Sequence, residues 1–219
     1  AKGWAGSLTM GAGQFCTNPC IAVVLASEQA DQFIETAQGA LSDVGAQTML
    51  TDGIASAYHD GQKRIAATSG VQDVLTTSCD LRNATPYLYT TSAKTWLANE
   101  TLTEEVFGPL GLVVVAETQD EMRDIAKNLQ GQLTCTVHMD DADTDAAAAM
   151  MPILERKAGR VLANGFPTGV EVSDTMVHGG PYPASTNFGA TSVGSLSIRR
   201  FLRPVCYQNM PAALLPADL

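Results

Sequence analysis

Several short stretches of this chain are apolar without the alternation of apolar and polar residues that marks a half-exposed strand. The clearest are residues 21–26 and 110–116, which are rich in Val, Leu and Ala. Continuous runs of this kind are typical of strands buried on both faces of a sheet. The pattern predicts strands at residues 21–26, 71–77, 87–91, 110–116, 133–139 and 160–164, and residues 201–207 could form one more.

Segments with apolar residues at helical spacing separate these strands. Four side chains stand where they can cap a first helical turn, and Gly159 is a predicted C-terminal stop. The four capping residues are Ser27, Asp52, Thr118 and Asp143. The predicted helices cover residues 28–41, 54–68, 119–129 and 144–157, with a helical turn at 92–97.

Strands that alternate with helices of this length indicate an α/β fold with a mainly parallel sheet covered by helices on both faces. We expect one domain at residues 1–185 and a C-terminal tail at 186–219. Residues 165–195 are rich in Gly, Pro, Ser and Thr and show little periodicity. A loop of that length inside a compact domain is usually functional.

Composition and charge exclude two classes of partner. The chain has 219 residues, of which 45% are hydrophobic and 16% charged, and its formal net charge is −10. Nucleic-acid binding needs a basic face, which 13 scattered Lys and Arg residues do not supply. No apolar run approaches the roughly 18 residues of a membrane-spanning helix. We therefore expect neither a nucleic-acid nor a membrane partner.

The cysteines and histidines show no framework or metal-binding spacing. The chain has five Cys and three His, and Cys16 and Cys20 form C-x3-C rather than C-x2-C. We therefore expect no metal site and no disulfide scaffold, which fits a reducing, cytoplasmic location. There is no signal-peptide pattern at the start. Because the chain begins without Met and soon reaches its candidate nucleophile, we expect it to be part of a longer protein.

Cys16 is that candidate nucleophile. It ends a glycine-rich turn that contains Gly11 and Gly13, and Pro19 marks the end of the turn. Glycines allow left-handed backbone and close approach, so free backbone N–H groups beside the thiol would favour a thiolate and a neighbouring oxyanion. The alternative is that Cys16 is a buried apolar filler, since free cysteine is among the most buried residue types.

Two motifs carry a resemblance to a known family. Gly13-Gln14-Phe15-Cys16-Thr17 resembles the nucleophile motif of the aldehyde dehydrogenases, and the Asn18-Pro19 that follows is similar to the branch acting on α-ketoglutaric semialdehyde (2,5-dioxopentanoate) and fatty aldehydes. About ninety residues later, Glu104-Glu105-Val106-Phe107-Gly108-Pro109 resembles the family's Glu-Glu-Ile-Phe-Gly-Pro. The resemblance implies that Glu105 binds the ribose of the nicotinamide and that Phe107 packs near it.

Later segments resemble the same branch. Residues 159–165 are similar to the family's late strand ending in Asn, and residues 178–185 stand where most members have Pro-Phe-Gly-Gly. The long loop that supplies the family's aromatic wall here contains Phe166, Pro167 and Tyr182, which we expect to line the aldehyde entrance. His178 could face the substrate or be a structural loop histidine.

The resemblance implies a mechanism and a missing half. Cys16 would attack the aldehyde to form a thiohemiacetal, NAD or NADP would accept a hydride, and water would hydrolyse the thioester. In the family the oxyanion-binding Asn, the general-base Glu and most of the dinucleotide site lie upstream of the nucleophile. We therefore expect this chain to need an N-terminal cofactor-binding half and to be inactive alone.

Three questions stay open on the sequence. Cys20 could be inert packing or could form a reversible bridge with Cys16 under oxidation. The segment 199–207 is too apolar to stay exposed to water. The resemblance implies that it pairs with a neighbouring subunit in a homo-oligomer. The competing functions are a cofactor-independent cysteine acyltransferase or hydrolase, and a non-catalytic oligomer-forming domain.

Overall fold

The computed structural model describes residues 1–218, so Leu219, the last residue of the predicted tail, lies outside the described residues. The chain forms six α-helices, eight strands and five short 3-10 helices within those residues. The helices are α1 (Lys2–Thr9), α2 (Glu28–Ser42), α3 (Asp52–Ala66), α4 (Ala93–Ala98), α5 (Gln119–Asn128) and α6 (Thr144–Lys157). The strands are β1 (Ile21–Leu25), β2 (Gln47–Thr48), β3 (Val71–Leu75), β4 (Asn83–Ala84), β5 (Tyr87–Ser92), β6 (Leu110–Ala116), β7 (Gln132–Val137) and β8 (Ala158–Ala163).

The main sheet has four strands in the order β1-β6-β5-β3. The central strand β6 runs parallel to β1, with Ile21 opposite Leu112, and parallel to β5, with Tyr87 opposite Leu110. The prediction of a mainly parallel sheet is therefore confirmed. Its edge strand β3 is antiparallel to β5, and β7 and β8 form a separate parallel pair, neither of which the apolar pattern revealed.

Helices cover both faces of the main sheet, as the continuous apolar runs require. Alternate residues of β6 point to opposite sides: Leu112 and Val114 join a core with α3, α4 and α5, whereas Val113 joins a core with α1 and α2. The first core is centred on Tyr58, Tyr89 and Trp96, each about 1% exposed or less. The second contains Trp4, Leu8 and Leu41. β6 is thus buried on both sides and anchors the whole domain.

Most predicted elements match within two residues, and four details were wrong. Asp143 directly precedes α6, but its side chain makes no capping hydrogen bond to that helix. Thr51 caps α3 by accepting a hydrogen bond from Ile54 N at 3.1 Å, while Asp52 is the first helical residue and pairs with Arg82. Gly159 does not stop α6, because the chain passes directly into β8 at Ala158. Residues 201–207 form no strand in the described chain, and Leu202 N instead donates to Arg199 O at 3.1 Å, as in a 3-10 turn.

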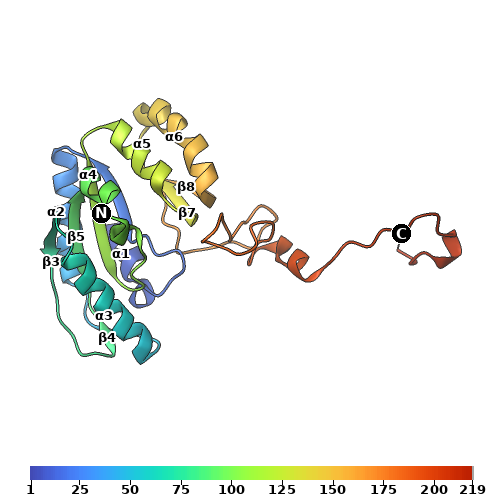
Figure 1. Ribbon diagram of the computed structural model, residues 1–219, viewed down its shortest axis with the longest axis horizontal. Helices are drawn as coiled ribbons and strands as arrows, with labels where there is room; N and C mark the ends of the chain where they lie inside the picture. The colour runs from blue at the N-terminus through green and yellow to red at the C-terminus, as the bar shows by residue number, and fades with distance from the viewer. Residues whose placement is uncertain (219) are drawn as a thin grey trace.

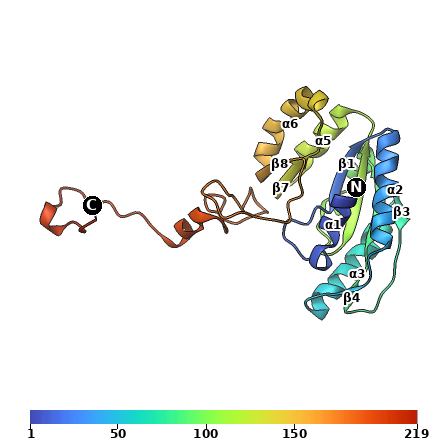
Figure 2. The same cartoon turned by 180° about the vertical axis from the view of Figure 1, so that it is seen from behind.

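Beyond β8 the chain has little regular structure. Within residues 164–218 the only helical segments are η4 (Ser195–Phe201) and η5 (Ala212–Leu214). Figures 1 and 2 show this part leaving the α/β body and extending away from it to the C-terminus. The segment at residues 179–181 stays close to the body, where it contacts the beginnings of β7 and β8. Within residues 1–218 no helix is both long and apolar enough to cross a membrane.

Candidate active site

The turn that carries Cys16 is built from three consecutive left-handed residues. Gly11, Ala12 and Gly13 have φ values of 57°, 58° and 68°, and together they form the end of η1 (Met10–Gly13). A left-handed conformation is costly for alanine, so Ala12 needs support from its surroundings. Ala12 is buried and its N–H donates a 2.7 Å hydrogen bond to Gln47 Oε1. The side chain of Gln47 therefore helps to hold the turn.

The two ends of the turn are tied to the main domain. Asn18 Nδ2 donates to the carbonyl oxygens of Leu8 and Gly13, at 2.8 and 3.1 Å. The indole of Trp4 donates to Pro19 O at 2.7 Å, and Cys20 O accepts from Leu112 N at 2.8 Å. Helix α1, which the apolar pattern did not predict, thus anchors the nucleophile turn to the sheet.

Gly13 packs directly against the second motif. A Cβ atom added at Gly13 would overlap with the peptide between Gly108 and Pro109, lying 2.6 Å from Gly108 O. Gly108 has a φ of 157°, and a Cβ there would overlap with the ring of Tyr58. The two motifs therefore meet backbone to backbone, which only glycine permits.

Cys16 is exposed, and its Sγ lies 3.2 Å from Nε2 of His178. The backbone of His178 is held on both sides: its N–H donates to Thr191 Oγ1 at 2.8 Å, and its carbonyl oxygen accepts from Ser192 N at 3.1 Å. Burial, followed by the positive charge of Arg160, lowers the pKa of His178 below its ordinary value. The imidazole is therefore neutral at neutral pH and can accept the proton of the thiol.

Glycines in three places let the chain bring His178 to this position. A Cβ at Gly159 of β8 would overlap with Gly179 O and lie 2.7 Å from its carbonyl carbon. A Cβ at Gly180 would overlap with Gln132 O at the start of β7, and one at Gly131 would overlap with Pro181 O. The segment after His178 therefore crosses the beginnings of β7 and β8 in backbone contact.

Glu105 lies three residues before Gly108, the glycine that contacts Gly13 in the turn before Cys16. Its side chain is exposed, yet partial burial raises its pKa. Burial, followed by the negative charge of Glu105, raises the pKa of the Cys20 thiol to about 11. The charge of Glu105 thus acts at Cys20, four residues from the candidate nucleophile. The preceding Glu104 instead forms a 3.2 Å ion pair with Arg64.

The residues predicted to line the aldehyde entrance lie in different surroundings. Phe166 packs against Gly3 and against the ring of His138, with 5.0 Å between centroids. Pro167 is buried and its carbonyl oxygen accepts from Arg160. Tyr182 is 78% exposed. Within residues 1–218 no hydrogen bond or ring contact joins these three to Cys16, so the entrance wall stays a prediction.

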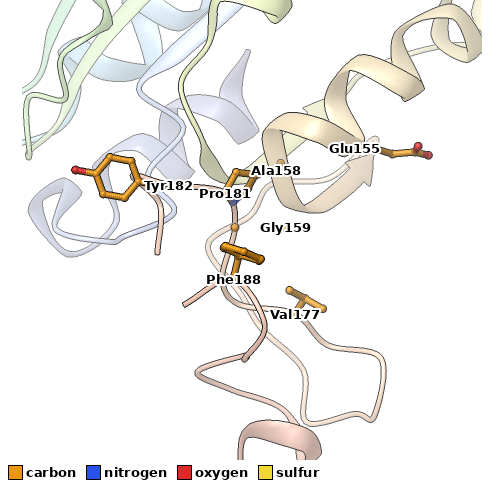
Figure 3. A pocket seen from close by; sticks show the side chains of 8 residues that line it. Glu155, Ala158, Gly159, Val177, Pro181, Tyr182 and Phe188 are labelled. Atoms are coloured by element: carbon orange, nitrogen blue, oxygen red, sulfur yellow. The ribbon is translucent and has the colours of Figure 1, made fainter. Parts of the chain in front are cut away.

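A cavity of about 450 Å³ lies between the end of α6, the start of β8 and the loop on either side of His178. It is lined by Glu155, Ala158, Gly159, Val177, Gly180, Pro181, Tyr182 and Phe188. In Figure 3, Phe188 lies below Pro181 and Gly159, while the ring of Tyr182 and the carboxylate of Glu155 point to opposite sides. Because the lining holds neither Cys16 nor His178, we do not assign the chemistry to this cavity.

Sequence reasoning missed the pairing of Cys16 with His178, and the supporting roles of Gln47 and Arg160. The only local signal was His178 next to two glycines, which marked a chain segment in close contact but named no partner. Within residues 1–218 no three His, Cys, Asp or Glu side chains gather as metal ligands would.

No protein-family model matches the chain. It is 46% identical over 224 residues to α-ketoglutaric semialdehyde dehydrogenase 2 of Azospirillum brasilense, and this match covers 100% of the chain. It is 40% identical over 219 residues to the α-ketoglutaric semialdehyde dehydrogenase of Acinetobacter baylyi, which covers 99% of the chain. The chain spans 42% of the length of each relative.

Solved structures share the fold. Betaine aldehyde dehydrogenase of Staphylococcus aureus in complex with NAD+ superposes with a TM-score of 0.71 at 18% identity, covering 90% of this chain and 40% of that one. Succinic semialdehyde dehydrogenase of Streptococcus pyogenes in complex with NADP+ gives 0.67 at 18% identity, covering 88% and 43%. By sequence the chain therefore matches the C-terminal part of α-ketoglutaric semialdehyde dehydrogenases, and its fold is that of aldehyde dehydrogenases.

Proposed function

We propose that this chain is the nucleophile-bearing part of an NAD(P)-dependent aldehyde dehydrogenase that oxidises α-ketoglutaric semialdehyde to the carboxylic acid. The 3.2 Å contact between Cys16 Sγ and His178 Nε2 carries the proposal, because it supplies a nucleophile together with a proton acceptor. The two relatives named for this substrate support the choice of aldehyde.

In the proposed reaction the thiol proton of Cys16 moves to Nε2 of His178. Sγ then forms a bond to the aldehyde carbon, and the carbonyl electron pair moves to oxygen, giving a thiohemiacetal oxyanion. The backbone N–H of Cys16 has no hydrogen-bond acceptor among the described residues, so it can donate to that oxyanion. The turn that holds this N–H is fixed before substrate binds, by Gln47 and Asn18.

The residues present fit one end of a nicotinamide cofactor. Glu105 has an exposed carboxylate that can accept hydrogen bonds from ribose hydroxyls, and the half-buried ring of Phe107 can pack beside it. The Gly13–Gly108 contact supports this, because Glu105 and Phe107 lie just before Gly108 in the chain. When bound, NAD+ or NADP+ would supply the hydride acceptor. The rest of the cofactor site, the oxyanion-binding Asn and the general-base Glu are proposed to lie in an N-terminal half.

The Cys16–His178 contact also favours the competing function, a cysteine hydrolase or acyltransferase that works without a cofactor. A Cys–His pair is the usual activated nucleophile of such enzymes. The two functions differ in the substrate from which the thioester forms. A hydrolase or acyltransferase takes an acyl donor, whereas the dehydrogenase takes an aldehyde. Only the dehydrogenase requires an oxidant, because the aldehyde carbon must lose a hydride to reach the acyl level.

The test compares this 219-residue chain with a chain extended upstream to the length of its relatives. We expect the extended chain to form NAD(P)H with 2,5-dioxopentanoate, and its Cys16→Ser variant to form none. The 219-residue chain should be inactive, since loss of a positioned general base alone costs about 10²–10⁴-fold. Measurable turnover by the short chain would contradict the proposed location of the other groups. Thioester formation from an activated acyl ester, but never from an aldehyde with NAD(P)+, would favour the hydrolase.

We also propose that residues 1–185 form the catalytic unit and residues 186–219 a tail that joins a homo-oligomer. The exposed apolar side chains of Phe201 and Leu202 support this, since such residues are normally covered. A cytoplasmic location is proposed as well, because all five cysteines are free.

A further inference from the structure

Arg160 on β8 is tied to the loop that leads to His178. Its Nη1 donates to Gly169 O and its Nη2 to Pro167 O, both at 2.7 Å. Nη1 also lies 3.7 Å from Sδ of Met176, two residues before His178. One side chain on a strand thus contacts three points of a segment that has no helix or strand of its own.

The loop before His178 depends on side-chain contacts of this kind to keep its conformation. A loop without regular backbone hydrogen bonds is held by side-chain contacts to the rigid elements beneath it. After His178 the ties are the backbone contacts of Gly179 and Gly180 with β8 and β7. Before His178, the contacts with Arg160 are the corresponding anchor.

The guanidinium also acts on His178 through its charge. Its positive charge is, after burial, the second cause that lowers the pKa of His178. Burial lowers the pKa of Arg160 itself, and the negative charge of the Cys16 thiolate opposes that shift. Cys16 from the nucleophile turn and Arg160 from β8 are the titratable groups found to act on His178 within residues 1–218.

We propose that Arg160 is a positioning residue for the Cys16–His178 pair, which holds the loop before His178 on β8 through Pro167 O and Gly169 O and so fixes the approach of the imidazole to the thiol. This inference rests on the proposed role of Cys16. The charge of a nearby cation opposes protonation of the resting imidazole, so His178 is neutral and free to accept the thiol proton when Sγ attacks the aldehyde. Arginine suits the task because its planar fork donates in two directions and stays charged at every working pH.

The proposal is tested in the 219-residue chain, without cofactor, with Arg160→Met and Arg160→Lys variants. The chain has only three histidines, so NMR titration can follow His178, assigned by loss of its signal in His178→Asn. A second readout is the rate of Cys16 alkylation by iodoacetamide at pH 7.5, divided by the rate at the exposed Cys206. Arg156→Met is the matched control, since it removes an exposed arginine from the neighbouring helix α6.

In Arg160→Met we expect the pKa of His178 to rise toward its ordinary value, because one cause of its lowering is removed. The Cys16:Cys206 ratio should fall to the level of His178→Asn, because the loop before His178 is no longer held on β8. Arg160→Lys keeps the charge but not the fork, so His178 should keep its lowered pKa while the labelling ratio falls to an intermediate value. Arg156→Met should change neither quantity.

An unchanged His178 pKa and an unchanged labelling ratio in Arg160→Met would overturn the proposal. If that variant does not fold, as judged by circular dichroism, an unchanged labelling ratio in Arg160→Lys would overturn it. His178→Asn separates this failure from failure of the proposed function. A lower Cys16:Cys206 ratio in His178→Asn with no effect at Arg160 rejects Arg160 alone, whereas no effect of His178→Asn rejects the Cys–His pair itself.

Discussion

Gly13 and Gly108 touch through their backbones, and this contact joins the nucleophile turn to the Glu105–Phe107 motif. Gly13 is left-handed, with a φ of 68°, and a Cβ atom there would overlap with the Gly108–Pro109 peptide. Backbone atoms such as those of Gly108 and Pro109 cannot move aside as the end of a flexible side chain can. The spacing between the two motifs in the folded chain therefore depends on the absence of a side chain at Gly13.

We predict that Gly13→Ala is strongly destabilising. The left-handed φ costs alanine about 1–2 kcal/mol, and the overlap with Gly108 adds to it, so the total should exceed about 2 kcal/mol. Urea denaturation measures the loss. The control is Gly6→Ala in α1, where a Cβ meets nothing within 4 Å and helix propensity should add about 0.5–1 kcal/mol of stability. Equal stability of the two variants would contradict the prediction.

We predict that Cys16 is alkylated faster than the other four thiols at pH 8. Burial raises the pKa of Cys20, and of Cys135, to about 11, so roughly one thiol in a thousand is ionised at each. Cys206 is exposed but has no histidine beside it among the described residues, which makes it the internal reference. Mass spectrometry after brief iodoacetamide treatment gives the order. Labelling of Cys79 or Cys135 first would exclude Cys16 as the nucleophile.

We predict that Gly159→Ala separates His178 from Cys16. The added methyl group would overlap with Gly179 O, and the segment must move because β8 is paired along its length with β7. The alkylation rate of Cys16 should fall to the level of His178→Asn, while the main sheet stays folded by circular dichroism. Gly39→Ala on the exposed side of α2 is the control, since a Cβ there has nothing within 4 Å. A normal Cys16 rate in Gly159→Ala would contradict this account of the loop.

We predict that deletion of the residues after Ser197 weakens self-association. The deleted part contains Phe201, Leu202 and Val205, which are 81%, 66% and 56% exposed in the single chain. Burying such side chains against a second copy would contribute about 25 cal/mol per Å² of apolar surface. Light scattering measures the mass, and a double change of Phe201 and Leu202 to Ser in the full chain should weaken association in the same direction. An unchanged mass in both variants would reject the tail as the interface.

The amino-acid pattern by itself determined most of the secondary structure and singled out Cys16 as the candidate nucleophile. Leu110–Ala116 and Thr144–Lys157 were predicted with the bounds that the structure has, and Ser27 and Thr118 cap helices as expected. These features are local: an apolar run reports burial on both faces, and a capping side chain bonds to an N–H three residues away. Cys16 and Glu105 could be proposed as site residues because each lies in a short motif.

Only the tertiary structure decided what lies beside Cys16. His178 is 162 residues away in the sequence, and its approach depends on Gly159, Gly131 and Arg160, which lie on elements far from the nucleophile turn. The antiparallel direction of β3, the separate β7–β8 pair and the helix α1 were missed for the same reason. Local patterns report which residues are buried, but the partner of each is set by the path of the connecting chain, and that path is fixed by contacts between residues distant in sequence.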